Sequence, residues 1–380
     1  MYRIDTIKDK FSNLLGWRQH HGEVMISESL TNSESGMYFQ DMHPLVTLDN
    51  IKSIAPDFGN EEGFSQWLRE KTTASILRAI SILYDEKLAD KTLKSLLESK
   101  VLFSGAGRLT DVVKATNSIV GFELVPLRAQ GATLRIEKIG LQFTKPGKVK
   151  LYVMHSSQAQ PVHTKEIEYT GNGSFQWVDA DIYLPYLSSE SDAGGSWFLC
   201  YDEKELPEGM RAIEKSKDWS KEPCRGCSRG EYESWQAWSK YLEVHPFKAH
   251  GTLPDMWDIA DNVYTYTTNY GMNLMVTMQC DITDILVSQR MTLANMIGLQ
   301  VASDMIREFA YNPNFRINRM AHNFSRTELL YELDGDSQGT KKSGLVYELA
   351  KAREAVNLDI SGISRVCLPC GKQGIRYRTV

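Results

Sequence analysis

The sequence predicts an α+β fold, in which a helical N-terminal unit, a central antiparallel β-sandwich and a C-terminal helical bundle with one long buried helix follow one another. Apolar residues recur at steps of three and four over residues 60–83 and again over 281–311, as they do on the buried face of a helix. Between these helices, residues 118–280 hold short runs of alternating apolar and polar residues, separated by glycine-rich turns. Such runs are typical of the strands of an antiparallel sandwich.

The length and composition of the chain indicate a folded protein of several parts. Its 380 residues correspond to two or three domains of roughly 100–200 residues each, and 42% hydrophobic and 24% charged residues are ordinary values for globular proteins. We divide the chain into an N-terminal arm (1–46), a helical unit (47–117), the β-sandwich (118–280) with a polar excursion (202–240), and a C-terminal helical region with a cysteine-containing tail (281–380).

The charge balance and the apolar runs bear on the classes of partner. A net charge of −5 argues against a general nucleic-acid binder, although the short basic tail over 372–378 could touch nucleic acid. No apolar run approaches the roughly 18–20 residues that span a bilayer, so we expect no membrane partner. Because the N-terminus also lacks the apolar core of a signal peptide, we expect the chain to be made and kept in the cytoplasm, unless it leaves inside a larger particle.

The first hundred residues predict an arm followed by three helices. The arm contains the polar stretch Ser27–Gly36, and such a segment either lies across a neighbouring subunit or packs as a loop on its own domain. The helical unit then begins with a short helix that ends before Pro56. A longer amphipathic helix follows, opened by Asn60 and an acidic first turn. A third helix is expected over Asp90–Leu102.

The middle of the chain predicts a β-bulge and a hairpin. In the run 134–143 the alternation slips by one residue between Ile136 and Ile139, which is what a bulge does to a two-residue period. The sequence Lys145-Pro146-Gly147-Lys148 has turn chemistry, so we interpret residues 134–155 as one β-hairpin.

The helix expected over 281–311 carries apolar residues on nearly all of its sides. A helix of this kind needs either the rest of its domain or neighbouring subunits to cover it. Three small residues at four-residue steps, Ala294, Gly298 and Ala302, leave room for a neighbour to come close. Two more helices are expected over Phe324–Leu333 and Gly344–Leu358.

Two CxxC motifs give the sharpest chemical signal, Cys224 with Cys227 and Cys367 with Cys370. Two intervening residues let both thiolates reach one ion, and four thiolates would close a tetrahedral structural zinc site that ties the tail to the excursion. The two motifs are much further apart than those of usual zinc knuckles, so the fold would have to bring them together. Free thiols, or a disulfide formed on oxidation, are the alternative.

The other candidate residues favour no catalytic chemistry. The sequence holds no phosphate-binding loop, dinucleotide-binding loop, nucleophile elbow or HExxH motif, and its eight histidines are scattered. Asp179 and Asp181 share one face of a strand, as calcium ligands or glycosidase acids do, but a solvated strand face is the favoured interpretation. Cys200 and Cys280 lie in apolar strands and are expected to be small buried residues. We therefore predict that the chain is not an enzyme and holds no cofactor other than one structural zinc.

Four stretches carry a further signal: Ser33–Asp41 with His43-Pro44-Leu45, Ile139–Phe143, Tyr241–Phe247 and Ile363–Cys370. Together they resemble uncharacterised structural proteins that tailed phages and prophages of Bacteroidetes encode, and the resemblance extends over most of the chain. It implies a component of the virion, at the neck as a head–tail connector or in the tail. Such a component works as many copies in a ring, next to portal, connector or tail proteins. The resemblance assigns no functional residues.

Two classes of function follow from these observations. A structural assembly protein is predicted by the resemblance, by the covered helix and by the polar arm. A carbohydrate-binding or adhesion protein would instead use aromatic residues of the sandwich, with Trp177, Trp197, Trp235 and Trp238 as candidates, and would need two or three aromatic residues exposed and coplanar. The three-residue step between Trp235 and Trp238 favours a helical turn packed on the body of the domain. An enzyme of the metal or thiol type rests only on the CxxC motifs.

Overall fold

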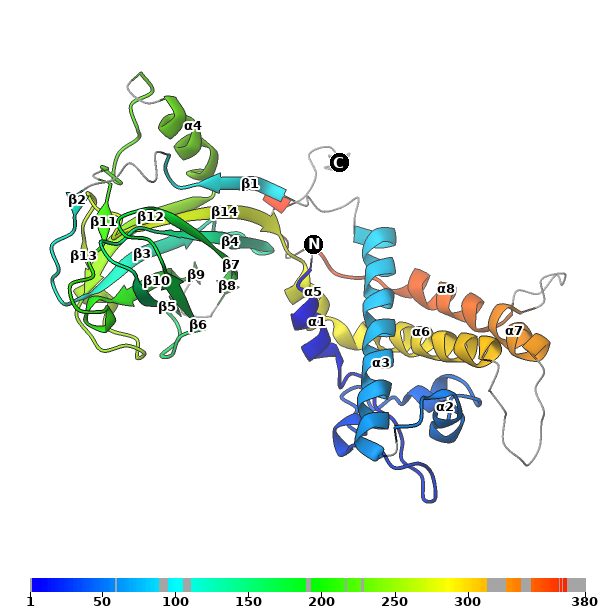
Figure 1. The fold of residues 1–380 in the computed structure, drawn as a ribbon. Helices are drawn as coiled ribbons and strands as arrows, with labels where there is room; N and C mark the ends of the chain where they lie inside the picture. The colour runs from blue at the N-terminus through cyan, green and yellow to red at the C-terminus, as the bar shows by residue number, and fades with distance from the viewer. Residues whose placement is uncertain are drawn as a thin grey trace, which may run out of the picture. The chain divides into compact units, whose positions relative to one another are not determined.

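The structure is a computed structural model of the chain (Figure 1). It describes residues 2–58, 60–88, 95–104, 111–188, 193–215, 217–226, 229–312, 326–335, 343–361, 363 and 365–367. The chain folds into two compact units, each built from two segments. The α unit comprises residues 1–92 and 282–361, and the β unit comprises 93–281 and 362–380. The mixed α+β class predicted above is therefore confirmed, with helices first, then sheets, then helices along the chain.

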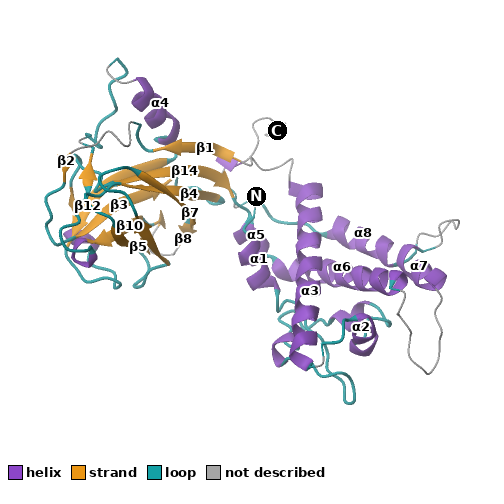
Figure 2. Ribbon diagram, in the orientation of Figure 1, coloured by secondary structure: helices purple, strands orange, loops and turns teal. Residues whose placement is uncertain are grey.

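The α unit is organised around its longest C-terminal helix, as Figure 2 shows. Its helices are α1 (Ile4–Phe11), α2 (Leu48–Ile54), α3 (Glu61–Leu83), α5 (Thr283–Ser288), α6 (Arg290–Tyr311), α7 (Arg326–Asp334) and α8 (Leu345–Ala355). Helix α6 packs against α2, α3, α7 and α8. The Asn60 side chain caps α3 by accepting a hydrogen bond from the backbone N–H of Gly63 at 2.8 Å, as its position before the acidic turn predicts.

The N-terminal segment packs on its own unit, which is the second of the two alternatives for the arm. The rings of Trp17 and Phe39 lie 4.7 Å apart between their centroids, and both side chains are buried. Gly16 forms a parallel bridge with Tyr38, so the segment folds back on itself before it meets α6 through the turn Phe39–Met42. The polar stretch Ser27–Gly36 contacts α3, because the Ser27 N–H donates to Ser65 Oγ at 2.9 Å and Arg69 donates to Ser29 Oγ at 2.6 Å.

Helix α6 is covered by residues of its own unit. Its buried apolar side chains occupy all sides, as predicted: Leu293, Met296, Ile297, Leu299, Val301, Met305, Ile306 and Phe309. Gly298, one of the three small residues of α6 at four-residue steps, lies close to the N-terminal segment. A Cβ atom on Gly298 would lie 2.8 Å from the sulfur of Met42 and 2.9 Å from Leu15 Cδ2. The N-terminal segment is therefore the neighbour that packs against these small residues.

The β unit contains two principal sheets in which every strand pair is antiparallel. The four-stranded sheet has the order β1-β14-β4-β7, and the six-stranded sheet has the order β13-β12-β3-β10-β5-β6. Two short pairs, β2 with β11 and β8 with β9, lie outside them. Phe143, which follows β4, meets Tyr169 of β6 and Tyr201 of β10 at 5.6 and 5.7 Å between ring centroids. Aromatic contacts of this kind between the sheets make the unit sandwich-like.

The bounds of these strands are β1 (Ser95–Val101), β2 (Asp111–Val112), β3 (Ile119–Pro126), β4 (Ala132–Leu141), β5 (Gly147–His155), β6 (His163–Tyr169), β7 (Gln176–Pro185), β8 (Leu187–Ser188), β9 (Ala193–Gly194), β10 (Trp197–Asp202), β11 (Ile213–Glu214), β12 (Leu242–Ala249), β13 (Val263–Tyr264) and β14 (Met272–Cys280). The excursion also contains helix α4 (Arg229–Trp238), which packs beside β1 (Figure 1). The six-stranded sheet is covered on its other face as well, because Leu253 and Trp257 close a core with Phe198 and Phe247.

The predicted bulge is confirmed, but the predicted hairpin is wrong. The register of β4 against β7 shifts between Ile136 and Lys138, where the alternation slips. Strand β5, however, pairs with β6 and β10 and not with β4, so the turn after β4 carries the chain from one sheet to the other. Turn chemistry specifies a reversal of the chain but not the sheet that the next strand joins.

The helix predicted over Asp90–Leu102 is also wrong where the structure describes it. Residues Ser95–Val101 form strand β1, which pairs antiparallel with β14 at the edge of the four-stranded sheet. Among the residues of this strand only Leu97 is buried, so the sequence carries little alternation to reveal it. Pairing with β14 outweighs local helix propensity here.

Candidate functional site

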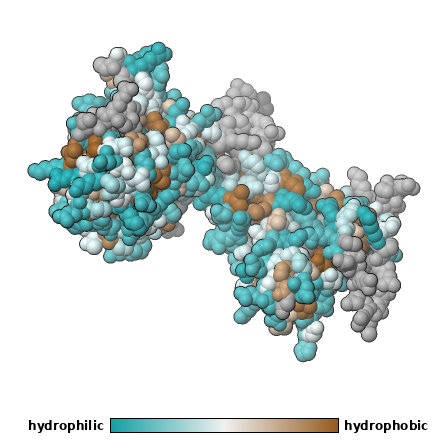
Figure 3. All heavy atoms as spheres, viewed as in Figure 1, coloured by the Kyte–Doolittle hydropathy of each residue, from teal (hydrophilic) through white to brown (hydrophobic). Residues whose placement is uncertain are grey.

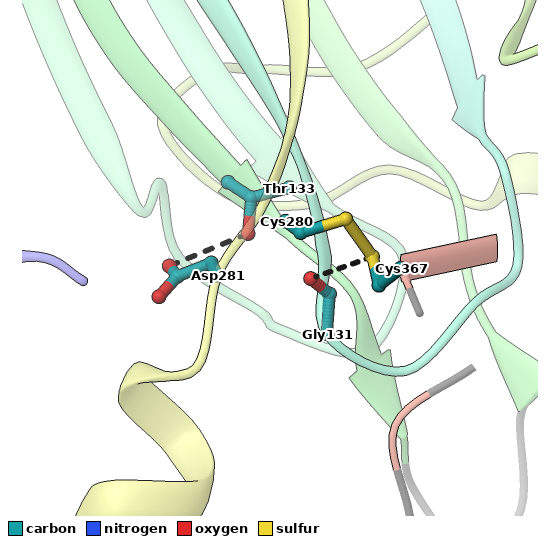
Figure 4. The surroundings of a disulfide bond; sticks show 5 residues. All are labelled: Gly131, Thr133, Cys280, Asp281 and Cys367. Carbon is teal, nitrogen blue, oxygen red and sulfur yellow. Dashed lines mark hydrogen bonds between the residues drawn. A yellow bond between two sulfur atoms is a disulfide. The ribbon is translucent and has the colours of Figure 1, made fainter. Parts of the chain in front are cut away.

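The cysteines of the β unit form a disulfide that the motif spacing does not suggest. Cys280 ends β14 and Cys367 lies in the short helical turn Arg365–Cys367; the two are bonded, with their Cα atoms 5.6 Å apart and both side chains buried (Figure 4). The Sγ atom of Cys367 lies 3.5 Å from the carbonyl oxygen of Gly131, which also accepts a hydrogen bond from the Asp281 N–H at 2.7 Å. The bond therefore fixes the returning chain next to the start of β4.

The predicted zinc ligands are not brought together in the described residues. Cys224 is exposed, Cys367 is in the disulfide, and Cys227 and Cys370 lie outside the described residues. Since only a thiolate binds zinc, the disulfide and the zinc site compete for Cys367. Within the described part of the chain, no group of three or more His, Cys, Asp or Glu side chains is placed to hold a metal ion. The four-cysteine site remains a prediction.

The two other cysteines expected in strands differ in state. Cys200 is buried and unbonded, as predicted, and burial raises the pKa of its thiol. Cys280 is buried, as predicted, but it forms a disulfide that was not predicted. Its partner is 87 residues away along the chain, which no local pattern reveals.

The acidic pair of β7 is neutralised by basic residues of the neighbouring strand. Asp181 forms an ion pair with Arg135 at 2.6 Å, and Asp179 forms one with Lys138 at 3.2 Å. Both carboxylates are exposed, at 61% and 86% of the side chain. This arrangement fits the favoured interpretation of a solvated strand face, where such pairs contribute little to stability.

The four tryptophans proposed as a sugar platform do not lie together on the surface. Trp197 and Trp238 are buried, and Trp177 and Trp235 are partly buried. Trp238 donates a hydrogen bond from Nε1 to the carbonyl oxygen of Leu102 at 3.1 Å, which anchors α4 on the body of the unit. The predicted packing of this helical turn is therefore confirmed for Trp238.

A different group of aromatic residues lies at the edge of the six-stranded sheet. The rings of Tyr264 and Tyr266 are within 21° of parallel, with centroids 6.2 Å apart, and each residue is 37% exposed. The ring of His245, on β12, lies 6.0 Å from Tyr264 and 6.3 Å from Tyr266. Trp219 is held beside them, because its backbone N–H donates to the carbonyl oxygen of Tyr266 at 2.8 Å. We name these four residues together with Trp235 the aromatic row.

A hollow of about 200 Å³ lies at one end of the aromatic row. Trp219, Trp235, Trp238 and His245 provide its aromatic lining, and hydroxyl, amino and carboxylate groups provide its polar lining: Ser220, Lys221, Glu222, Ser239 and Glu243. The indole N–H of Trp219 is buried and has no hydrogen-bond acceptor among the described residues. Aromatic side chains combined with a few polar groups that can fix a ligand's orientation are common in small-molecule sites.

A partly buried lysine, Lys217, places its amine next to this hollow. Lys217 Nζ lies 4.5 Å from the ring centroid of Trp219 and 5.8 Å from that of Trp238. Burial lowers the pKa of Lys217 to about 8. Burial, together with a hydrogen bond to Glu123, raises the pKa of Tyr264 to about 12, so this phenol stays neutral at physiological pH.

The sequence analysis missed the aromatic row, although one signal was present. Tyr264-Thr265-Tyr266 places two rings two residues apart, which in an extended chain puts both on the same face. The other members come from the excursion and from β12, so their proximity depends on the sheet order.

Comparisons with known proteins give no assignment for this arrangement. No family model, no curated protein and no solved structure matches the chain. Of the helices in the described residues, none combines the length and the apolar character that crossing a membrane requires.

Proposed function

We propose that the chain is a structural component of a tailed-phage virion, at the neck as a head–tail connector or in the tail, and that it assembles with copies of itself in a ring. The observation that carries this proposal is the resemblance of four stretches of the sequence to virion structural proteins of phages and prophages of Bacteroidetes. Other virion proteins, such as portal, connector or tail components, are its expected partners, after assembly in the host cytoplasm. The proposal includes neither catalysis, nor a membrane, nor specific contact with nucleic acid.

The described parts of the four stretches lie at positions that build the scaffold of both units. Phe39 packs against Trp17 under α6, Leu141 ends β4 beside Phe143, Phe247 belongs to the core of β12, and Cys367 forms the disulfide. Likeness at such positions supports a shared fold rather than shared chemistry. This is what a family of assembly proteins would retain.

The buried sides of α6 are covered by its own unit, so surfaces for ring contacts must be sought at exposed residues of the α unit. Tyr311 and Tyr331 of the α unit are exposed at 59% and 57%. Arg326 lies over the Tyr311 ring at 4.6 Å. Tyrosine and arginine are enriched at protein interfaces, so this surface is a candidate for subunit contacts.

The proposal is tested by locating the chain in assembled particles. Mass spectrometry of purified virions, induced from a host that carries the gene, should detect the protein in fixed proportion to the portal protein. Electron microscopy of particles with a tagged copy should place the label at the neck or the tail. Absence from particles that contain all other structural proteins would contradict the proposal.

A second candidate function is carbohydrate binding by the sandwich. The specific observation in its favour is the pair Tyr264 and Tyr266, which has the exposure and ring alignment that the four tryptophans lack. A glycan array probed with the full chain tests it, since an adhesion protein gives reproducible signals and an assembly protein without sugar affinity gives none.

The structural zinc at Cys224, Cys227, Cys367 and Cys370 is a separate proposal. Elemental analysis of protein purified under reducing conditions should find one zinc per chain if the four thiolates meet. Protein isolated with the Cys280–Cys367 bond intact should then hold none, because the disulfide removes one ligand. Absence of zinc from the reduced protein would contradict this proposal.

A further inference from the structure

We infer that the aromatic row and its hollow bind an uncharged oligosaccharide, with one sugar ring in the hollow beside Trp219 and Trp235 and the following ring over Tyr266 and Tyr264. This inference deepens the second candidate function and does not depend on ring assembly. Of the four tryptophans considered from the sequence, it keeps Trp235 and Trp238 at the hollow and adds Trp219, Tyr264 and Tyr266.

The aromatic faces favour a ligand with flat apolar faces. The rings of Tyr264, which ends the edge strand β13, and Tyr266, two residues further on, are within 21° of parallel, and each residue is 37% exposed. The C–H groups of a pyranose ring form one such face, and they pack on aromatic rings by dispersion and by the attraction of C–H dipoles to the π-cloud. On the face drawn in Figure 3, hydrophobic residues form small patches between hydrophilic ones.

The polar groups of the hollow match sugar hydroxyls. Glu222 and Glu243 offer carboxylate acceptors, and Ser239 offers a hydroxyl that both donates and accepts. The Ser220 hydroxyl donates to Asp218 Oδ1 at 2.5 Å, so it offers an acceptor only. The buried indole N–H of Trp219 needs an acceptor that the described residues do not supply. Because each sugar hydroxyl donates one hydrogen bond and accepts two, one ligand can satisfy both kinds of group.

The charge at the site argues against a cationic ligand. A cage of tryptophans with nearby carboxylates can bind an ammonium group through cation–π attraction. Here Lys217 already places its own amine 4.5 Å from the Trp219 centroid, and Lys221 lines the hollow. Lys217 therefore already occupies the cation–π position at Trp219 that a cationic ligand would use, whereas an uncharged sugar does not need this position.

The position of His245 argues for a ligand longer than one ring. His245 both lines the hollow and contacts Tyr264 and Tyr266, so it joins the enclosed end of the row to the exposed end. The backbone hydrogen bond from Trp219 to Tyr266 keeps the two ends side by side. A monosaccharide fills only the hollow, and at least a disaccharide is needed to reach the tyrosines.

The experiment uses the full chain and three variants. An array of immobilised β-glucans, mannans, xylans, chitin fragments and bacterial surface polysaccharides identifies the glycan class, and calorimetric titration with a soluble tetrasaccharide of that class measures affinity. Tyr266→Ala should weaken binding about ten-fold, and Tyr266→Phe should stay within about two-fold of the native chain, because it keeps the aromatic face. Val162→Ala, which truncates an exposed apolar side chain of the β unit outside the aromatic row, is the control and should leave the affinity unchanged.

The outcomes separate this inference from the function on which it rests. No signal on the array would overturn both the second candidate function and the site. Binding that Tyr266→Ala leaves unchanged would overturn the site and keep carbohydrate binding, with the sugar elsewhere on the chain. Loss of binding in Tyr266→Phe as well as Tyr266→Ala would show that the phenol rather than the ring face matters, which overturns the stacking geometry. If Tyr266→Ala instead changes only the sedimentation of the protein, the row is a contact between copies and the inference fails.

Discussion

The α unit and the β unit treat their aromatic residues differently. In the α unit, Trp17 and Phe39 are buried against each other, and the exposed Tyr311 packs under an arginine. In the β unit, Tyr264 and Tyr266 pair with each other at the surface and extend toward a hollow lined by tryptophans. The comparison teaches that the position of an aromatic residue in its unit decides its role: Trp17 and Phe39 lie outside the α-helices but are buried in the unit, whereas Tyr264 and Tyr266 at the edge of a sheet remain accessible to a partner.

The largest effect is expected at the buried side of helix α6, in the core of the α unit. Ile297→Asp should lower the free energy of unfolding of the α unit by more than about 4 kcal/mol, because it buries an unpaired carboxylate at a side chain with no exposed area. Met291→Asp, on the same helix but 48% exposed, should change it by less than about 0.5 kcal/mol. Urea unfolding followed by circular dichroism measures both. Similar losses in the two variants would show that α6 is not covered as described.

The disulfide gives the next largest effect, in the β unit. Cys367→Ser opens a loop of 87 residues and should lower the free energy of unfolding by about 3 kcal/mol. Cys224→Ser removes an exposed thiol and should have no measurable effect. The comparison is made by urea unfolding without reductant. If both variants unfold like the native chain, the Cys280–Cys367 bond does not stabilise the protein.

The pH dependence of stability tests the burial of Lys217, which lies next to the aromatic row. Burial lowers the pKa of Lys217 to about 8, below its usual 10.5, so between these values the unfolded chain keeps a proton that the folded chain has released. The free energy of unfolding should therefore rise as pH increases from 7.5 to 9.5, on the order of 1 kcal/mol.

A pair of lysine variants isolates this effect. Lys217→Met should lose the rise, whereas Lys221→Met, which removes an exposed lysine of the same segment paired with Asp218, should keep it. Chemical unfolding at the two pH values measures the difference. An equal rise in Lys217→Met and in the native chain would show that this amine does not titrate in that range.

The smallest effect is expected at the acidic pair of β7. Asp181 forms an exposed ion pair with Arg135 and has a φ of +52°, a conformation that asparagine adopts readily. Asp181→Asn should therefore change the free energy of unfolding by less than about 0.5 kcal/mol. A loss above about 2 kcal/mol in thermal unfolding would contradict the interpretation of this pair as a solvated strand face.

Much of the fold was predictable because it depends on local periodicity. The three- and four-residue steps around Leu293 and Phe309 indicated α6, and the slip after Ile136 indicated the bulge. The hairpin over 134–155 and the helix over Asp90–Leu102 were wrong because sheet order and edge pairing are decided by distant residues.

The candidate site was less predictable than the fold. The aromatic row combines segments around positions 219, 235, 245 and 265, which only the order β13-β12-β3 and the excursion bring together. The disulfide joins residues 87 positions apart, beyond the reach of any spacing rule. The CxxC motifs directed attention to Cys367, but the described structure gives it a partner outside both motifs.

Native mass spectrometry of the purified full chain tests the proposed assembly most directly. A ring of identical subunits predicts a dominant species at an integral multiple of the 43.1 kDa chain mass, which Ile297→Asp abolishes by unfolding the α unit and Met291→Asp preserves. A single species at 43.1 kDa at every protein concentration would contradict the proposal that this chain forms a ring with its own copies.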